Sequence, residues 1–336
     1  MRPSVEPGGP FARTEEKRIT VVTQDETSGG TPGRDLPFAA PVARELQRVE
    51  QILSDLVPRD IPLLSEIHAR IVSGGKRLRP ALVLLSARVF RVLGQQDEML
   101  YRAAVAVEAV HLASLLHDDL IDKAPLRRGR PTIPQEFGLG PTLLAGDYLA
   151  ALAYPRLCLQ SRHRSLSLLA TAVGRMCEAE FHMMSSHEVD ERAYYAGAAG
   201  KTGALISAAC EIGAVEVGAD LQPAQLLGAY GRDLGIAFQI ADDMLDIFGR
   251  PEVTGKPVGQ DLVTGQPNLV VILALQADTD GALREQISAL REDDASAPAL
   301  EDLVEQMRRL KIDRKAQKIA ESYAAQARTF LADLPR

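Results

Sequence analysis

The sequence predicts an all-α protein, and three of its features support that prediction. From about residue 41 onward, apolar residues recur at spacings of three and four, which is the period of an amphipathic helix. Alternating β-branched runs bounded by hairpin turns are missing, whereas alanine is abundant. Proline and glycine gather between the periodic segments, where they end one helix and let the chain turn into the next. We therefore expect roughly ten or more helices.

The expected helices follow one another along the chain with short interruptions. Those of the N-terminal half span residues 42–56, 61–72, 81–93, 99–116 and 142–159. Those of the C-terminal half span residues 165–184, 202–215 and 226–248 and continue through the last third of the chain. Gly74 and Gly75 separate the second helix from the third. Because this pair follows a helix rather than a strand, we do not interpret it as a nucleotide-binding loop.

Residues 1–40 differ from the rest of the chain. They are rich in proline, glycine, serine and charged residues, and they contain few large apolar side chains whose burial would offset the entropy of ordering. We expect a disordered leader over residues 1–40 and a single folded domain over residues 41–336.

Composition and charge narrow the class of protein. The 336 residues carry a net charge of −7, and an isoelectric point near 5.5 argues against a general nucleic-acid binder, which needs a basic surface. The three cysteines (Cys158, Cys177 and Cys210) are far apart and odd in number, as is typical of a reducing compartment. We find no apolar run long enough to span a membrane and no signal peptide, so we expect a cytoplasmic protein.

Two clusters of aspartates, each of the form DDxxD, end long apolar segments. On a helix, the first and last aspartates of such a motif are four residues apart and share one face, where their charges repel each other. Clustered carboxylate oxygens are the ligands that Mg²⁺ prefers, above all when substrate phosphates complete its coordination. A solvated acidic helix end would explain one cluster, but two clusters behind apolar flanks favour a metal site. The six candidate ligands are Asp118, Asp119, Asp122, Asp242, Asp243 and Asp246.

Basic residues gather in places that would match a polyanionic substrate. One group lies in GGKRLRP, near a helix start whose N–H groups favour anions, and another lies in RRGRPT, just after the first aspartate cluster. We interpret Arg77 and Arg130, within these segments, as solvated charges. Carboxylates for Mg²⁺ together with arginine and lysine side chains indicate a diphosphate site. Its candidate residues are Lys76, Arg79, Arg127, Arg128, Lys201 with the adjacent Thr202, and Lys256.

These motifs together resemble those of the trans-isoprenyl (polyprenyl) diphosphate synthase family. Over about residues 41–332 the chain contains, in that family's order and approximate spacing, GGKRLRP, HLASLLHDDLID with RRGRPT, LLAGDYL, KTG, FQIADDMLD and GKPVGQDL. The resemblance implies the isoprenoid synthase fold, an antiparallel helix bundle around a central cavity, and a homodimer. It makes residues 41–336 a polyprenyl synthase catalytic domain whose substrates are isopentenyl diphosphate and an allylic prenyl diphosphate.

The resemblance also implies a role for each candidate residue. The six aspartates hold a trinuclear Mg²⁺ cluster on the allylic diphosphate, whose direct protein contacts are Arg127, Lys201 and Lys256, with Thr202 and Gln239 nearby. The diphosphate of isopentenyl diphosphate is bound by Lys76, Arg79, His111 and Arg128, and Phe238 packs against the hydrocarbon. Departure of the allylic diphosphate leaves a carbocation that the isopentenyl double bond attacks. The proton then lost passes to the departing diphosphate, so no dedicated side-chain base is needed.

Product length depends, in this family, on residues just before the first aspartate cluster. Ala113 and Ser114 stand where short-chain members carry an aromatic residue, and Val110 is a further candidate for the floor of the cavity. Because small side chains leave the cavity open, we expect a product longer than farnesyl diphosphate. We also expect a peripheral membrane contact through which such an apolar product is released.

The chain departs from the family pattern at several positions. Gln266 replaces a diphosphate-contacting lysine, and Asn268 stands where threonine is usual. Residues 178–183 lack the glycine and the glutamine of an EGE-x-x-Q segment. The sequence also stops at LADLPR, where relatives continue into a last helix and a basic tail. All the carboxylates of both motifs are kept. We interpret His117, beside Asp118, as a helix-capping or supporting group rather than a catalytic one.

Three other classes of protein would explain parts of this pattern. A non-catalytic or regulatory subunit of a heteromeric synthase would share the fold, but such subunits typically lose an aspartate motif. A metal phosphohydrolase of the HD type is suggested by His117 and Asp118, but that class needs further histidine ligands at separate positions. A terpene cyclase needs no second diphosphate site and would lack GGKRLRP. An elongating prenyltransferase uses every motif.

Overall fold

The computed structural model describes residues 37–94, 97–127, 129–158, 163–185, 190–249, 258–292 and 297–335, and within these ranges the regular structure is almost entirely helical, as predicted. The only strands in this part of the chain are the two-residue β1 (Leu126–Arg127) and β2 (Arg130–Pro131), which form a small antiparallel hairpin. The elements that precede this hairpin are η1 (Pro37–Val42), α1 (Ala43–Ser54), α2 (Pro62–Val72), α3 (Leu78–Arg88) and α4 (Glu98–Ile121).

The elements that follow the hairpin complete the bundle. They are α5 (Ile133–Phe137), α6 (Leu139–Cys158), α7 (His163–Ser185), α8 (Glu191–Ala198), η2 (Ala199–Gly203), α9 (Ala204–Glu216), α10 (Leu221–Phe248), α12 (Gln260–Thr264), α13 (Leu269–Ala277), α14 (Ala282–Glu292), α15 (Ala297–Arg309) and α16 (Ile312–Ala332). The predicted helices all appear, with shifted ends. Residues 1–36 lie outside the described ranges, but the predicted leader boundary at residue 40 is too late, because Ala39 in η1 is fully buried.

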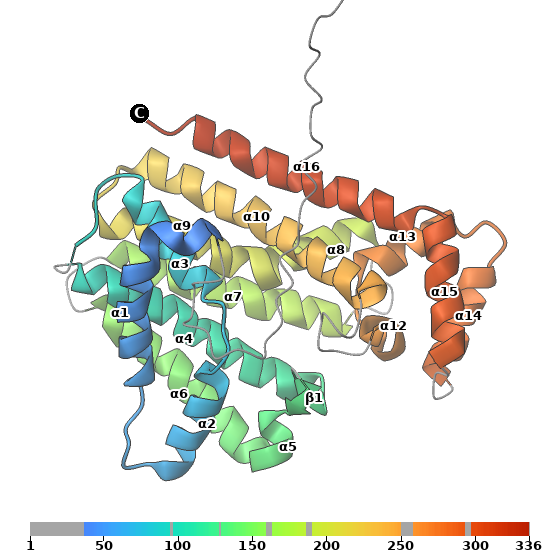
Figure 1. The fold of residues 1–336 in the computed structure, drawn as a ribbon, viewed down its shortest axis with the longest axis horizontal. Helices are drawn as coiled ribbons and strands as arrows, with labels where there is room; N and C mark the ends of the chain where they lie inside the picture. Colours follow the sequence, from blue (N-terminus) through green and yellow to red (C-terminus); the bar gives the residue numbers. More distant parts are fainter. Residues whose placement is uncertain are drawn as a thin grey trace, which may run out of the picture.

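Helix α4 forms the centre of the larger of two buried apolar clusters. Its middle stretch from Ala103 to Val110 is buried on all sides, and most of these residues are alanine or valine, whose small side chains allow close packing of α6, α3 and α9 around it. The smaller cluster lies between the C-terminal half of α10 and α12 to α16. In Figure 1, α10 and α16 lie side by side, and the C-terminal ends of α4 and α10 lie at the same end of the bundle, near β1 and α12.

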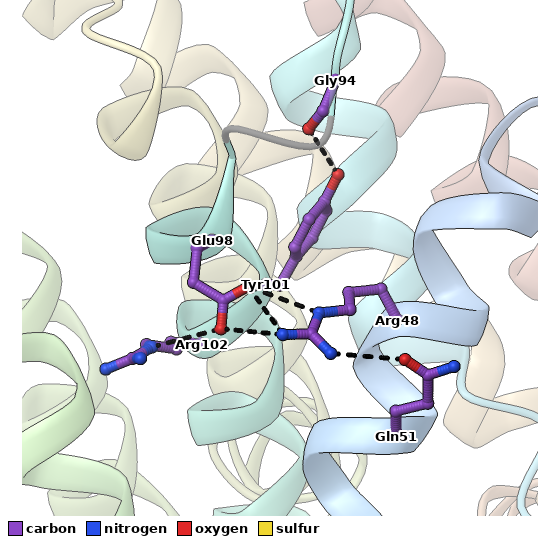
Figure 2. A network of polar contacts seen from close by, with 6 residues as sticks. All are labelled: Arg48, Gln51, Gly94, Glu98, Tyr101 and Arg102. Carbon is purple, nitrogen blue, oxygen red and sulfur yellow. Dashed lines mark hydrogen bonds and ion pairs between the residues drawn. The ribbon is translucent and has the colours of Figure 1, made fainter.

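The opposite end of α4 is tied to α1 by a polar network (Figure 2). Arg48 of α1 donates to both carboxylate oxygens of Glu98 at 3.2–3.4 Å, and Arg102 lies 3.5 Å from the same carboxylate. The hydroxyl of Tyr101 donates to the carbonyl of Gly94 at 2.7 Å. A groove of about 430 Å³ runs beside this network and is lined in part by Arg156. Because Asp118 follows Glu98 along α4 and each residue rises about 1.5 Å, this groove lies about 30 Å from the start of the first aspartate cluster.

Among the described residues, α4 is the one helix that is long and apolar enough to cross a membrane, judged by length and composition alone. Of its most apolar window, 72% is buried inside the protein, which is what the core helix of a bundle also shows.

Candidate active site

The first aspartate cluster lies at the C-terminal end of α4, and its three carboxylates have different surroundings. Asp118 is partly buried and Asp122, the C-cap residue, is exposed, whereas Asp119 points inward and is only 2% exposed. Arg127 of β1 donates its Nε to Asp119 at 2.7 Å, so the hairpin is held against the end of α4. Asp118 and Asp122 therefore face outward together, as the four-residue spacing predicts.

The second cluster lies near the end of α10 and repeats this arrangement. Its middle aspartate, Asp243, is 2% exposed and accepts hydrogen bonds from the backbone N–H of Leu269 at 2.7 Å and from Gln239 at 3.0 Å. Burial raises the pKa of Asp243 to about 7, although these hydrogen bonds oppose the shift. Asp242 is exposed, and Asp246 accepts from the backbone N–H of Asp261 at 3.1 Å.

The turn η2 reaches the first cluster through Lys201. Its Nζ lies 3.8 Å from Asp118 and 2.8 Å from Glu180 of α7. Burial raises the pKa of Asp118 and the charge of Lys201 opposes that rise. Burial alone would lower the pKa of Lys201, but the charges of Asp118 and Glu180 outweigh it and the net shift is upward. Glu180 belongs to residues 178–183, which were noted above only because they depart from the family pattern. It forms an ion pair with Lys201, a predicted substrate-binding residue.

The residue after Lys201 connects η2 to the second cluster. The hydroxyl of Thr202 donates to Gln239 at 2.7 Å, and Gln239 in turn donates to Asp243. This contact needs η2 and α10 to approach closely, and a Cβ added at Gly235 would lie only 2.5 Å from the Cα of Gly203. The predicted helix start at residue 202 is wrong, because Lys201 and Thr202 lie in a π-helical turn inside the continuous run α8–η2–α9. Such turns occur often at functional sites.

A second connection between the clusters follows α12. Gln266 donates to Asp122 at 2.8 Å, across 144 residues of sequence. Two residues later, Asn268 is fully buried; its side chain accepts from the N–H of Val270, capping α13, and donates to Asp261 at 2.9 Å and to the carbonyl of Asp243 at 3.3 Å. The two departures from the family pattern therefore join the ends of α4 and α10.

The GGKRLRP segment places its basic residues in three environments. Lys76 is exposed, and Arg79 lies in the first turn of α3 with a buried Nε that has no hydrogen-bond partner. Burial lowers the pKa of Arg79, and the charges of Glu108 and Asp242 oppose that shift. The interpretation of Arg77 as a solvated charge is wrong, because the residue is 3% exposed and ion-paired with Glu50 and Glu108. Arg130 is exposed, as expected.

Other predicted site residues lie on α4 and α10. Phe238 is 41% exposed on α10, one position before Gln239, and His111 lies partly buried on α4. The candidate floor residues Val110 and Ala113 are buried, and Ser114 is partly buried with its hydroxyl bonded to the carbonyl of His111. Arg128 and Lys256 lie outside the described residues, so their roles stay predictions.

His117 does not cap a helix, contrary to one of its two expected roles. It lies inside α4, and its ring packs over Gly146 of α6, where an added Cβ would be 2.3 Å from Nε2. Its Nε2 lies 3.5 Å from Asp147. His117 thus supports the packing of α4 on α6, next to the first cluster.

The donor set fits magnesium that is shared with a substrate. Among the residues that the structure describes, no three His, Cys, Asp or Glu side chains are close enough to form a complete metal site on their own. The two helix ends nevertheless present hard carboxylate oxygens, and cationic side chains lie beside them. Mg²⁺ usually keeps several waters and takes one or two carboxylates together with substrate phosphates, rather than an all-protein cage. Asp118, Asp122 and Asp242, which are less buried than Asp119 and Asp243, would hold such an ion.

Comparisons with known proteins identify the family of the chain. The family model described as polyprenyl synthetase matches residues 61–307. The chain is 38% identical over 251 residues to heptaprenyl diphosphate synthase component 2 of Geobacillus stearothermophilus. The matched region covers 73% of this chain and 76% of the relative. It is 34% identical over 250 residues to octaprenyl diphosphate synthase of Haemophilus influenzae, covering 72% and 75%.

Solved structures show the same fold. The crystal structure of a polyprenyl synthase from Caulobacter crescentus CB15, complexed with calcium and isoprenyl diphosphate, matches with a TM-score of 0.82 at 30% identity and covers 89% of this chain and 91% of that one. A decaprenyl diphosphate synthase from Rhodobacter capsulatus matches with a TM-score of 0.80 at 32% identity, covering 89% and 92%. The predicted all-α fold class is confirmed, and the chain belongs to the polyprenyl synthetase family of prenyltransferases.

Proposed function

We propose that the protein condenses isopentenyl diphosphate head-to-tail onto an allylic prenyl diphosphate, that the reaction depends on Mg²⁺ and releases diphosphate, and that the product is longer than farnesyl diphosphate. The observation that carries this proposal is the joining of two DDxxD helix ends, through Lys201 and Thr202 of η2 on one side and through Gln266 and Asn268 on the other. Carboxylates for a hard cation and side-chain cations for phosphates thereby lie at one end of the bundle.

The residues of the chain divide the work between the two substrates. Lys201 and Arg127, each oriented by a carboxylate, would contact the allylic diphosphate and stabilise the negative charge that grows on it as it leaves. Lys76 and Arg79 would bind the second diphosphate, and the exposed ring of Phe238 would cover the isopentenyl hydrocarbon. Magnesium, when bound, would supply further positive charge to the leaving diphosphate. Catalysis would then rest on positioning and electrostatics, without a side-chain base.

The decisive assay is elongation by the purified chain alone. Incubation with Mg²⁺, radiolabelled isopentenyl diphosphate and farnesyl or geranylgeranyl diphosphate is expected to give labelled products, which are dephosphorylated and sized by chromatography. Addition of EDTA in excess over Mg²⁺ serves as the control and is expected to stop the reaction. A chain that elongates none of these allylic primers would refute the enzymatic proposal.

The position of Gln266 leads to a separate prediction. Gln266→Lys would place an ammonium group beside Asp122 and the allylic diphosphate, so KM for the allylic substrate is expected to fall about fivefold, equivalent to ~1 kcal/mol for one partly exposed charged contact. Steady-state kinetics at saturating isopentenyl diphosphate measure it. Thr264→Lys, an exposed position in α12, adds the same charge without reaching Asp122 and should leave KM unchanged. Equal effects of the two variants would show that net charge, not this contact, is responsible.

A second candidate concerns the assembly in which the chain works. Two relatives carry the name heptaprenyl diphosphate synthase component 2, which says that those enzymes have more than one component. We expect a homodimer that is active alone, and the alternative is a subunit that needs a different chain. Light scattering on the purified protein, together with the elongation assay, separates the two. A dimer without activity that gains elongation on addition of the source cell's extract would favour the heteromeric alternative.

A further inference from the structure

Arg77 is the buried cation of the GGKRLRP segment, and the proposed reaction leaves it without a role. Its side chain is 2% exposed, although the residues on either side of it in this segment include the exposed Lys76. Its backbone adopts φ = 54°, in the left-handed region that residues other than glycine seldom occupy. A charged side chain in such a place is costly unless each of its donors has a partner.

The guanidinium of Arg77 joins three helices at the point where α3 begins. Its Nε and one Nη contact Glu50 of α1, and Nη1 donates to Glu108 of α4 at 3.3 Å. Nη2 also donates to the carbonyl of Val72, the last residue of α2, at 2.5 Å. A planar fork of five N–H donors can serve all these acceptors at once, which a lysine cannot do.

The two glycines before Arg77 make this arrangement possible. Gly74 has φ = 79°, so the chain reverses there without a side-chain clash. A Cβ added at Gly75 would lie 1.9 Å from Nη1 of Arg77, so the guanidinium folds back directly over this glycine. Gly75 has no positive φ, and its requirement for glycine therefore comes from the Arg77 side chain rather than from its own backbone.

We propose that Arg77 is a positioning residue for the second diphosphate: by fixing the turn between α2 and α3 onto α1 and α4, it holds Lys76 and Arg79 where they bind isopentenyl diphosphate. This inference rests on the proposed function. Lys76 directly precedes Arg77, and Arg79 follows it by two residues at the start of α3, so a shift of the turn moves both cations. Glu108 faces both Arg77 and Arg79, which ties the same carboxylate on α4 to the anchor and to the substrate-binding arginine.

The test is the KM for each substrate measured separately. Arg77→Met is expected to raise KM for isopentenyl diphosphate about tenfold or more at saturating allylic diphosphate, because a small displacement of binding groups costs affinity steeply. The KM for the allylic substrate, which is bound at the ends of α4 and α10, should change less than about twofold on the same reasoning. Arg77→Lys keeps the charge but not the fork, so it should recover only part of the affinity.

Gly75→Ala provides a second route to the same contact, and it decides the question if Arg77→Met does not fold. Its methyl group displaces the guanidinium, so KM for isopentenyl diphosphate should rise in the same direction. In the Arg77→Met background, Gly75→Ala should have no further effect, since the atom that it would strike is gone. Full additivity of the two changes would contradict the proposed contact.

A matched control separates positioning from general loss of stability. Arg164→Met removes another partly buried ion pair, with Glu211 at 2.6 Å between α7 and α9, and should lower the melting temperature without a selective effect on isopentenyl diphosphate. Equal rises in both KM values for Arg77→Met, or unchanged values, would overturn the inference. A wild-type chain that elongates no primer would instead refute the proposed function, so the two failures are distinguishable.

Discussion

Changing both Asp118 and Asp242 to alanine is expected to abolish elongation, with kcat falling about a thousandfold or more, as happens when groups that stabilise transition-state charge are removed. These two residues begin the two motifs: Asp118 is partly buried with its carboxylate 3.8 Å from the Nζ of Lys201, and Asp242 is exposed. Asp118 lies in the last turn of α4, where the helix dipole disfavours a negative charge. Because neither side chain is fully buried, the double variant is expected to remain folded.

The measurement pairs single-turnover elongation with thermal unfolding of the same preparation. Asp55→Ala serves as the matched control, because Asp55 is an exposed carboxylate near the far end of α4 whose ion pair with Arg59 is equally exposed. It should leave turnover unchanged. Retained turnover in the Asp118/Asp242 double variant, with a normal melting temperature, would refute the assignment of these carboxylates to the metal.

Ala113→Phe is expected to shorten the product. Ala113 is buried on α4, five residues before Asp118, so a phenyl ring there would occupy space that a growing prenyl chain needs. Overpacking of a buried position costs about 1–3 kcal/mol, so a lower melting temperature is also expected. Chromatographic sizing of the dephosphorylated products, with the same primer for both proteins, measures the change.

Two further variants distinguish a blocked cavity from a damaged enzyme. Ala113→Val adds less volume and should shorten the product less than phenylalanine does. Ala325→Phe places the same ring on an exposed face of α16 and should leave the product unchanged. An unaltered product distribution in Ala113→Phe, at normal activity, would show that the floor of the cavity lies elsewhere.

Local sequence patterns predicted most of the fold and the position of both aspartate clusters. The helical period, the glycine and proline breaks and the i, i+4 spacing of the motifs act over a few residues, so they are visible without knowledge of tertiary contacts. The hairpin after α4 is not predicted, because a two-residue pair of strands has too few residues to show a period. The end of the leader was misplaced for a similar reason, since one buried alanine in η1 carries no pattern.

The residues that were misjudged depend on contacts between distant segments. Arg77 meets Glu50 and Glu108, which are 27 and 31 positions away, and no local feature indicates that both carboxylates converge on it. The unusual glycine pair before it was the available signal. Gln266 was recognised as a departure from the family pattern, but its hydrogen bond to Asp122 joins residues 144 positions apart and became visible only in the folded chain.

Helix α4 runs from Glu98 to Ile121 without a proline or a glycine. The number of residues between a position and Asp118 therefore gives the distance between them along the helix axis. Each turn away from Asp118 corresponds to about 5.4 Å along the helix axis. Ala113, Val110 and Ala106, all buried, lie at increasing distances from Asp118 along the axis of α4. To set the length of a released prenyl chain, one would first choose the position along α4 at which to introduce a larger side chain, and then the size of that side chain.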